Sequence, residues 1–453
     1  MQDLSPTLLT RNPANALTTI HTLPDEILDM ILDLYLKHPD FRGSHYRLCH
    51  PTNPLMTITH VCARWRHHAL SRPLLWSIAH IYVPRSVDPS TTSLISDTQW
   101  ESRMLSLIDA LETWLARSGD CPLRITLCHS EEGLRKVWKK PLPVKLGWKL
   151  VRLLLSTSYR WKEVSIRVSC DEWSIPYAYL VTMHPSRIPI LEKVHSEVRI
   201  RSDLTLSEEE DDYEGEGGDN DGERNSEGSG DSSEHDNGDW KDKSHRVPHK
   251  LSIGDFTILS GPSVRDVAIH SYSGNIGHAP IVWEMLTHLS IGYPSYPQRS
   301  VGRNRALNIL KKCPALVFCS LKMSDVDAEP DALTFTSPLI MQNLTDLWFP
   351  TDITVHNNPL PFLVLPALRA LKFRHCLRVD RQASVPLYLQ WLEKYGSQLT
   401  TFKINDSVAV SHEDLASFLE KVPNVTRLEI FTNTMAMTLL QEPTYSTKGH
   451  LNS

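Results

Sequence analysis

The sequence predicts an α/β protein: a small helical module at the N-terminus, then a long series of parallel strands with helices outside, interrupted by an acidic segment. Three observations lead to this prediction. A spaced apolar pattern recurs along the chain, helical runs precede several of its copies, and one acidic stretch has almost no aliphatic residues. At 453 residues the chain exceeds the size that one compact core usually supports, so more than one unit is expected.

The recurring pattern has the form apolar-x-x-apolar-x-apolar. It occurs as Trp161/Val164/Ile166, Val264/Val267/Ile269, Leu286/Leu289/Ile291, Leu316/Cys319/Leu321, Leu344/Leu347/Phe349, Leu368/Leu371/Phe373, Leu399/Phe402/Ile404 and Val425/Leu428/Ile430, with a degenerate copy at Leu191/Val194. From Val264 onward, the first positions are 22, 30, 28, 24, 31 and 26 residues apart. The last two apolar positions of each copy are two apart, which predicts a short strand with one buried face.

Helical runs precede several of these copies. In "NRALNILKKCP" the apolar residues Leu307, Ile309 and Leu310 are spaced for a short helix that Cys313-Pro314 ends. The stretch "HEDLASFLEKVP" repeats the plan with Leu415, Phe418, Leu419 and a break at Val422-Pro423, and "SVPLYLQWLEKYG" does so with Gly396 as its C-terminal stop. Helix, break and strand in repetition predict stacked parallel strands with the helices outside.

This arrangement resembles an irregular leucine-rich-repeat solenoid, because the apolar pattern matches the L-x-x-L-x-L core of that repeat. The Asn or Cys that usually follows this core is not regularly present, so the repeats are degenerate. A conventional α/β domain with parallel strands is the alternative. We place the two parts of the repeat-like domain at residues 81–204 and 247–435.

An acidic segment separates these two parts. Between Glu208 and Asp239 there are 15 acidic residues and one basic residue, Arg224, for a local charge of −14, which leaves 46 basic and 38 acidic residues, or +8, in the remainder. Such a composition buries too little apolar surface to offset its ordering entropy, so residues 205–246 are expected to be disordered. The segment is either a solvated loop insertion or a regulated segment that binds basic partners. Flexible ends are expected at 1–20 and 436–453.

Composition also restricts the surroundings and partners of the protein. The eight cysteines are scattered with no CxxC pair, which favours buried thiols in a reducing compartment, cytoplasmic or nuclear. The sequence has no apolar run of about 18 residues, so it predicts no membrane span. Its N-terminus lacks the pattern of a secretory signal. A charge of +8 spread over the remainder favours a solvated surface over nucleic-acid binding.

The N-terminal stretch "TLPDEILDMILDLYL" predicts a helix with Thr22 as its cap and Pro24 in its first turn. Its apolar residues cover well over half of the circumference, more than one packed face requires; they are Ile27, Leu28, Met30, Ile31, Leu32, Leu34, Tyr35 and Leu36. A polar loop at 38–54 follows. The stretch "LMTITHVCARWRHHAL" then predicts a second helix with Ile58, Val61, Cys62 and Trp65 on its apolar side, and "SIAHIYV" predicts a strand.

Three blocks of this N-terminal region resemble an F-box, particularly the F-box-like form of mushroom-type fungi. They are the Leu-Pro-x-Glu-Ile-Leu opening, the Val-Cys-x-x-Trp centre and the closing Pro-x-Leu-Trp, within residues 21–80. The loop at 38–54 is longer than in the typical animal F-box. The resemblance implies a three-helix module that docks on a Skp-family adaptor and through it on a cullin–RING ubiquitin ligase. It assigns adaptor contact or shared packing to Leu23, Pro24, Ile27, Leu28, Ile31, Val61, Trp65, Leu74, Leu75 and Trp76.

These resemblances imply a substrate-recruiting subunit whose repeat-like domain binds a target protein of unknown identity. An interaction scaffold outside ubiquitination is the alternative, and a catalytic α/β domain is a more distant one. The sequence contains no P-loop, GxSxG or HExxH motif, and its Cys and His residues lack paired metal-ligand spacing. We therefore expect no catalytic residues, cofactor or metal, and no enzymatic activity of the chain's own.

Overall fold

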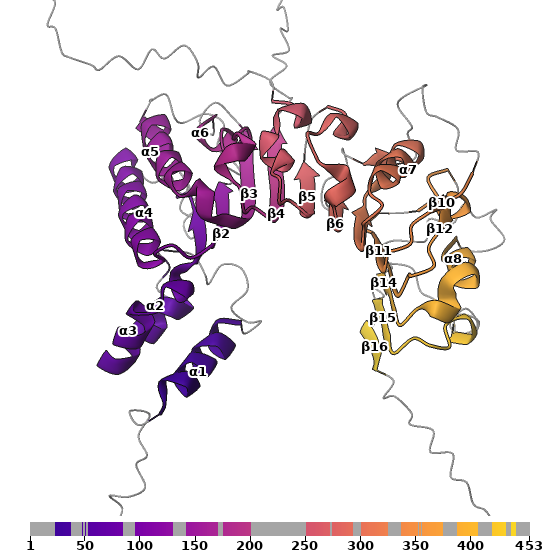
Figure 1. Cartoon of the computed structure of the whole chain (residues 1–453), viewed down its shortest axis with the longest axis horizontal. Coiled ribbons are helices and arrows are strands. Elements are labelled where there is room, and N and C mark those ends of the chain that lie inside the picture. Colours follow the sequence, from indigo (N-terminus) through magenta and orange to yellow (C-terminus); the bar gives the residue numbers. More distant parts are fainter. Residues whose placement is uncertain are drawn as a thin grey trace, which may run out of the picture.

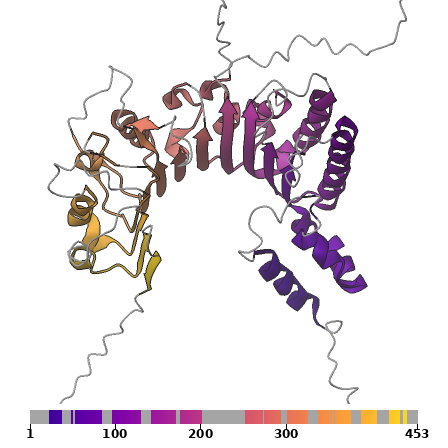
Figure 2. The ribbon, with the colours of Figure 1, turned by 180° about the vertical axis from the view of Figure 1, so that it is seen from behind.

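A computed structural model shows an arch in which one curved sheet lines the inner side and the longer helices lie outside (Figures 1 and 2). Helices α1–α3 form one foot of the arch, and the C-terminal strands form the other. The structure describes residues 23–37, 48, 50, 53–84, 96–129, 142–170, 175–200, 251–271, 274–292, 300–324, 337–351, 353–354, 356–374, 387–405, 419–431 and 436–440. The predicted disordered segment 205–246 lies outside these residues.

The main sheet has twelve strands, and their order across the sheet is their order along the chain. The first eleven run parallel, and β16 is antiparallel to β15. The twelve strands are β1 (Ile78–Tyr82), β2 (Leu123–His129), β3 (Trp161–Cys170), β4 (Lys193–Ile200), β5 (Asp266–Ser271), β6 (His288–Ile291), β8 (Phe318–Leu321), β11 (Asp346–Phe349), β13 (Ala370–Phe373), β14 (Thr401–Asn405), β15 (Arg427–Phe431) and β16 (Ala436–Leu440). Two small parallel pairs accompany the sheet: β7 (Val301–Gly302) with β9 (Met323–Ser324), and β10 (Leu339–Ile340) with β12 (Leu363–Val364).

The apolar pattern of the sequence sets the register of this sheet. The middle position of each copy lies beside the middle position of the next, which joins Val164, Val194, Val267, Leu289, Cys319, Leu347, Leu371, Phe402 and Leu428 into one row. All nine side chains are buried. A shift of one residue in any strand would expose its buried side chains, so the row fixes the pairing. The prediction of an α/β protein with parallel strands is confirmed.

Helices α4 to α8 lie on the opposite side of the sheet from the arch's interior, whereas α1 to α3 form the foot next to β1. The longer ones are α1 (Asp25–Lys37), α3 (Ala63–Leu70), α4 (Asp97–Arg117), α5 (Leu142–Ser156), α7 (Arg303–Lys312) and α8 (Leu387–Tyr395), with shorter α2 (Pro54–Thr59) and α6 (Ile175–Ala178). Short 3-10 helices complete the connections: η5 (Pro73–Trp76), η6 (Ser158–Arg160), η7 (Pro185–Arg187), η9 (Ile253–Asp255), η10 (Thr257–Ser260), η11 (Ile276–His278), η12 (Trp283–Met285), η13 (Leu360–Phe362) and η14 (Gly396–Gln398). Of the described residues, none forms a helix long and apolar enough to cross a membrane.

Several local predictions have a clear outcome. The helix ending before Cys313-Pro314 is α7, and Leu307, Ile309 and Leu310 are buried on it. The single helix expected over 55–70 is wrong, because the chain turns at His60–Val61 and starts α3 with the Cys62 thiol accepting a hydrogen bond from the Trp65 amide. Leu415 and Phe418 lie outside the described residues.

Two further parts of the chain differ from expectation. The strand β2 was not among the predicted units, although Leu123, Ile125 and Leu127 alternate in burial along it. Ala436–Leu440 was expected to belong to a flexible end, but it pairs with β15 as strand β16. At the other end of the sheet, β1 begins at Ile78, within the region assigned to the N-terminal module.

Gly396 follows α8 for a different reason from the one expected. Its backbone does not have a positive φ, so it is not a left-handed helix stop. A Cβ atom at this position would instead lie 2.2 Å from the Lys421 carbonyl oxygen. The position therefore needs glycine because the backbone of the next unit approaches it closely.

Replacing Gly396 with alanine should therefore destabilise the sheet's C-terminal end. We expect Gly396→Ala to lower the free energy of unfolding by about 2–3 kcal/mol, because the Lys421 backbone must move to relieve the clash. Urea unfolding measures the loss. Gly254→Ala is the control, because a Cβ at Gly254 meets no atom closer than 3.4 Å. Equal losses for the two variants would contradict this explanation.

Candidate functional site

The N-terminal module, defined here as α1, α2, α3 and η5, is built on a small set of buried side chains. Leu28 and Leu32 of α1 belong to the same core as Ile58 of α2 and Trp65 of α3. Trp76 of η5 closes the module: its indole Nε1 donates to the Ala69 carbonyl at 2.8 Å, and its ring packs edge-on against Trp114 of α4, with centroids 4.7 Å apart. The module thus shares one continuous core with the sheet region.

Helix α1 has two distinct apolar faces. The inward face holds Leu28 and Leu32, fully buried, with Ile31 and Tyr35 packed partly against the core. The outward face holds Ile27, Met30 and Leu34, which are 40%, 58% and 67% exposed. These three residues, spaced i, i+3 and i+7, form one line along the helix, which we call the α1 stripe. A row of large apolar side chains left in water is typical of an interaction surface.

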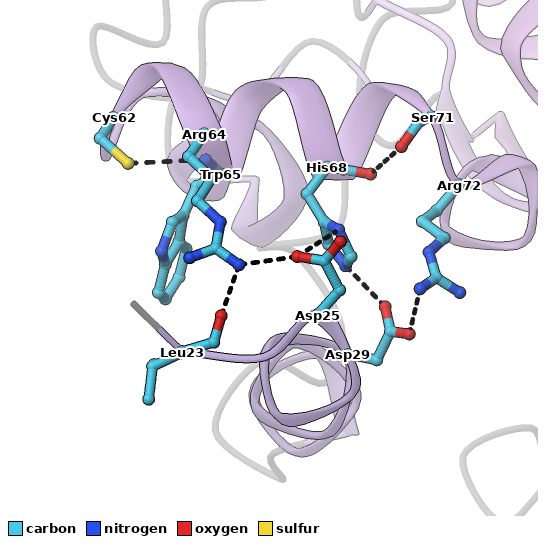
Figure 3. A network of polar contacts seen from close by, with 9 residues as sticks. All are labelled: Leu23, Asp25, Asp29, Cys62, Arg64, Trp65, His68, Ser71 and Arg72. Carbon is cyan, nitrogen blue, oxygen red and sulfur yellow. Dashed lines mark hydrogen bonds and ion pairs between the residues drawn. The ribbon is translucent and has the colours of Figure 1, made fainter. Parts of the chain in front are cut away.

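A third face of α1 is polar and is held to α3 by charged groups (Figure 3). Arg64 donates to the Leu23 carbonyl and, at 2.7 Å, to the Asp25 carboxylate. One helical turn along, the Asp29 carboxylate contacts His68 Nε2 at 2.7 Å and forms an ion pair with Arg72. We call these five residues together with Leu23 the α1–α3 clamp. The clamp fixes the start and the rotation of α1, and with them the direction in which the α1 stripe faces.

The charge of Asp25 belongs to this arrangement. The hydrogen bond from Arg64 lowers the pKa of the Asp25 carboxyl below its ordinary value, against a smaller opposing effect of burial. Asp25 and Glu26 also lie in the first turn of α1, where the helix dipole favours negative charge. The Asp25 carboxylate therefore stays ionised through the mildly acidic range and keeps its ion pair with Arg64.

The sequence-predicted contact residues fall into two groups. Leu28, Trp65 and Trp76 are buried and pack inside the module. Ile31 and Leu75 are partly buried against the same core. Pro24, Ile27, Val61 and Leu74 are exposed, and Leu23 is half-buried. The Pro24 carbonyl accepts the first helical hydrogen bonds, from Ile27 and Leu28, so Pro24 precedes α1. Val61 lies in the turn before α3 and not on the apolar side of a helix.

Some residues of this surface were not predicted as contacts. Met30 and Leu34 complete the α1 stripe, and Asp25, Asp29, Arg64, His68 and Arg72 form the clamp. A sequence signal existed for both groups. Ile27, Met30 and Leu34 share one helical face. Asp25 and Asp29 are four residues apart, as are the basic residues Arg64, His68 and Arg72 further along the chain.

Neutralising Asp29 should loosen α1. Asp29→Asn removes the negative charge that pairs with His68 and Arg72, at an expected cost of about 1–2 kcal/mol. Hydrogen exchange of the α1 amides should become several-fold faster while the sheet amides keep their protection. Glu26→Gln is the matched control, with the same charge change one turn earlier. If α1 exchanges equally fast in both variants, the clamp does not hold the helix.

The inner face of the sheet, meaning the strand side chains that point away from the helices, carries a second cluster of titratable groups. His195 of β4 and His270 of β5 contact each other, Nε2 to Nδ1, at 3.1 Å. Burial, the charge of the other histidine and Arg167 lower the pKa of His195 to about 3, and burial with Arg167 lowers that of His270 to about 4. Both imidazoles are therefore neutral at physiological pH.

The chemistry available elsewhere is limited within the part of the chain that the structure describes. No three His, Cys, Asp or Glu side chains come together there as a metal site. Cys313 and Cys319 are buried free thiols, and burial raises the pKa of Cys313 to about 12 and that of Cys319 well above its ordinary value. Protonated, buried thiols are poor nucleophiles. The α1 stripe is thus the feature best suited to a function.

No protein-family model matches the sequence, and no curated protein is significantly similar to it.

Proposed function

We propose that this chain is the substrate-recruiting F-box subunit of a Skp–cullin–F-box ubiquitin ligase. In this proposal the N-terminal module binds the Skp-family adaptor, and the sheet region binds a target protein. Ubiquitin transfer is carried out by other subunits, so the chain contributes proximity: tethering raises the local concentration of target lysines near the charged ubiquitin carrier.

The observation that carries the proposal is the α1 stripe. Ile27, Met30 and Leu34 stay exposed although the same helix buries Leu28 and Leu32 on its other face. In the clamp, two aspartates and three basic residues hold the helix in that orientation. This is the surface expected of a helical module whose apolar side is covered by a partner chain, and the sequence blocks around it resemble the F-box.

The sheet supports the second half of the proposal. Its strands follow chain order, with one aligned apolar row, and in the part of the chain that the structure describes helices α4 to α8 lie on one side of it. A doubly wound α/β domain has helices on both faces and a reversal of strand order. The observed order favours degenerate leucine-rich repeats, and such arrays offer an extended inner surface to a protein ligand.

The test is co-purification of the full chain with the Skp-family adaptor of the same organism. We expect a stable complex that, joined to the cullin and its RING subunit, transfers ubiquitin to proteins bound by the chain. Recovery of other proteins without the adaptor would support the alternative, an interaction scaffold outside ubiquitination. Adaptor binding without any ubiquitin transfer would overturn the ligase role.

A further inference from the structure

The two halves of the sheet's inner face differ in charge balance. In the first half each described cation of the face has a carboxylate on the neighbouring strand: Arg124 with Glu163, Arg167 with Glu197, and Lys193 with Asp266, at 3.5–3.8 Å. Positive and negative charges there cancel in pairs. Among these described pairs, that half therefore has no excess of either charge.

In the second half the exposed and half-buried cations outnumber the carboxylates. Lys372, Lys403 and Arg427 alternate with buried side chains on β13 to β15 and so face the interior of the arch, and Arg374 directly follows β13. Among the described strand residues from β11 to β15, the acidic ones are Asp346 and Glu429. Strands β11, β14 and β15 line the inner side of this limb, with α8 outside (Figure 1). We call Lys372, Arg374, Lys403 and Arg427, together with Trp348, the basic patch.

The described carboxylates are fewer than the cations of the basic patch. Lys372 Nζ is 3.9 Å from Asp346, and both side chains are about one-third exposed, so the pair is weak and easily exchanged. Glu429 is mostly buried between Lys403 and Arg427, and the hydrogen bonds from these two residues lower its pKa. One carboxylate thus serves two cations, and no described acid pairs with Arg374.

Three residues of the basic patch form a row across neighbouring strands. Trp348, Lys372 and Lys403 occupy one row across β11, β13 and β14, so their Cα atoms are about 5 Å apart. Arg374 directly follows β13, two residues after Lys372. The row therefore sets two lysines and one aromatic side chain next to one another across three neighbouring strands. The half-buried Trp348 adds apolar area beside the charges.

From these observations we infer that the basic patch binds an extended, Asp/Glu-rich segment of the recruited target protein. The inference rests on the proposed function for the role of this ligand as a target, and it names the chemical class of that target. Charge complementarity is the argument for it. The bound segment lies across β11 to β15 with carboxylates at Lys372, Arg374 and Lys403.

Fluorescence polarisation of a labelled peptide of alternating Glu and Gly, about sixteen residues long, tests the inference on the full chain. We expect salt-dependent binding that Lys372→Glu/Arg374→Glu weakens about tenfold or more. The control Lys145→Glu/Lys311→Glu makes the same charge change on exposed residues of α5 and α7 and should bind as the wild type does. A peptide of alternating Gln and Gly should not bind.

Three results would overturn the inference: no binding of the acidic peptide, equal weakening by the control variant, or binding only after deletion of 205–246. The last result would make the chain's own acidic segment the occupant. Since the Skp-family adaptor is absent from this measurement, its outcome is separate from that of the proposed function. Adaptor binding without peptide binding defeats only the inference, and peptide binding without adaptor binding defeats only the ligase proposal.

Discussion

Placing aspartate at two positions of the α1 stripe should abolish recovery of the Skp-family adaptor. In Ile27→Asp/Leu34→Asp, two charged groups replace apolar side chains that the proposed complex buries. Each such loss at the centre of an interface costs about 2 kcal/mol or more, so we expect affinity to fall by about 100-fold or more. Titration calorimetry with the purified adaptor measures it. Because both side chains already face water, the free energy of unfolding should hardly change.

A matched control separates this effect from a general loss of solubility or folding. Leu105 of α4 is also an exposed leucine on a helix, 37% accessible, and it lies outside the N-terminal module. Leu105→Asp should bind the adaptor as the wild type does. Equal affinity of Ile27→Asp/Leu34→Asp and wild type would mean that the α1 stripe does not contact the adaptor.

Acidification to pH 5 should destabilise the protein through the neutral histidine pair. In the folded chain the pKa values of His195 and His270 are about 3 and about 4, against an ordinary value near 6.5 in the unfolded chain. Below pH 6.5 the unfolded chain therefore takes up protons that the folded chain does not. The stability contributed by the pair is complete above pH 6.5 and is lost as the pH falls toward 4.

We expect the pair to lower the free energy of unfolding by about 2–3 kcal/mol between pH 7 and pH 5, after allowing for its partial exposure. Urea unfolding at the two pH values measures this. His195→Gln/His270→Gln should lose much less stability on acidification, whereas exposed His356→Gln should behave as the wild type. His80, whose pKa is also lowered by burial, remains in each variant, so the free energy of unfolding of the double variant should still fall slightly with pH. An identical change in the free energy of unfolding between pH 7 and pH 5 for wild type and the double variant would refute this account.

Most of the sheet could be predicted from sequence because its strands obey a local rule. Val267, Leu289, Cys319 and their equivalents are buried at a fixed place in each unit, and that spacing is visible without knowledge of neighbours. The strand β2 was missed because its unit lacked the full pattern. The break between α2 and α3 was missed because Val61 and Cys62 continue the apolar spacing of a helix while the chain turns there.

The candidate site could be predicted only in part, for a physical reason. Ile27 and Leu28 are adjacent and equally apolar, yet one is exposed and the other is fully buried. Which face of α1 turns inward depends on the clamp to Arg64, His68 and Arg72, about 40 residues further along the chain. Gly396 is similar, because its neighbour Lys421 is distant in sequence. Such tertiary contacts are not encoded in local periodicity.

Hydrogen exchange of the full chain with and without the Skp-family adaptor tests the central claim most directly, because it reports on α1 itself. The proposal predicts a complex in which the amides of Asp25–Lys37 gain protection, with the outer helices α5 and α7 unchanged. Formation of no complex, or of a complex that leaves the α1 amides exchanging at their original rates, would contradict the claim that this helix is the adaptor-binding surface.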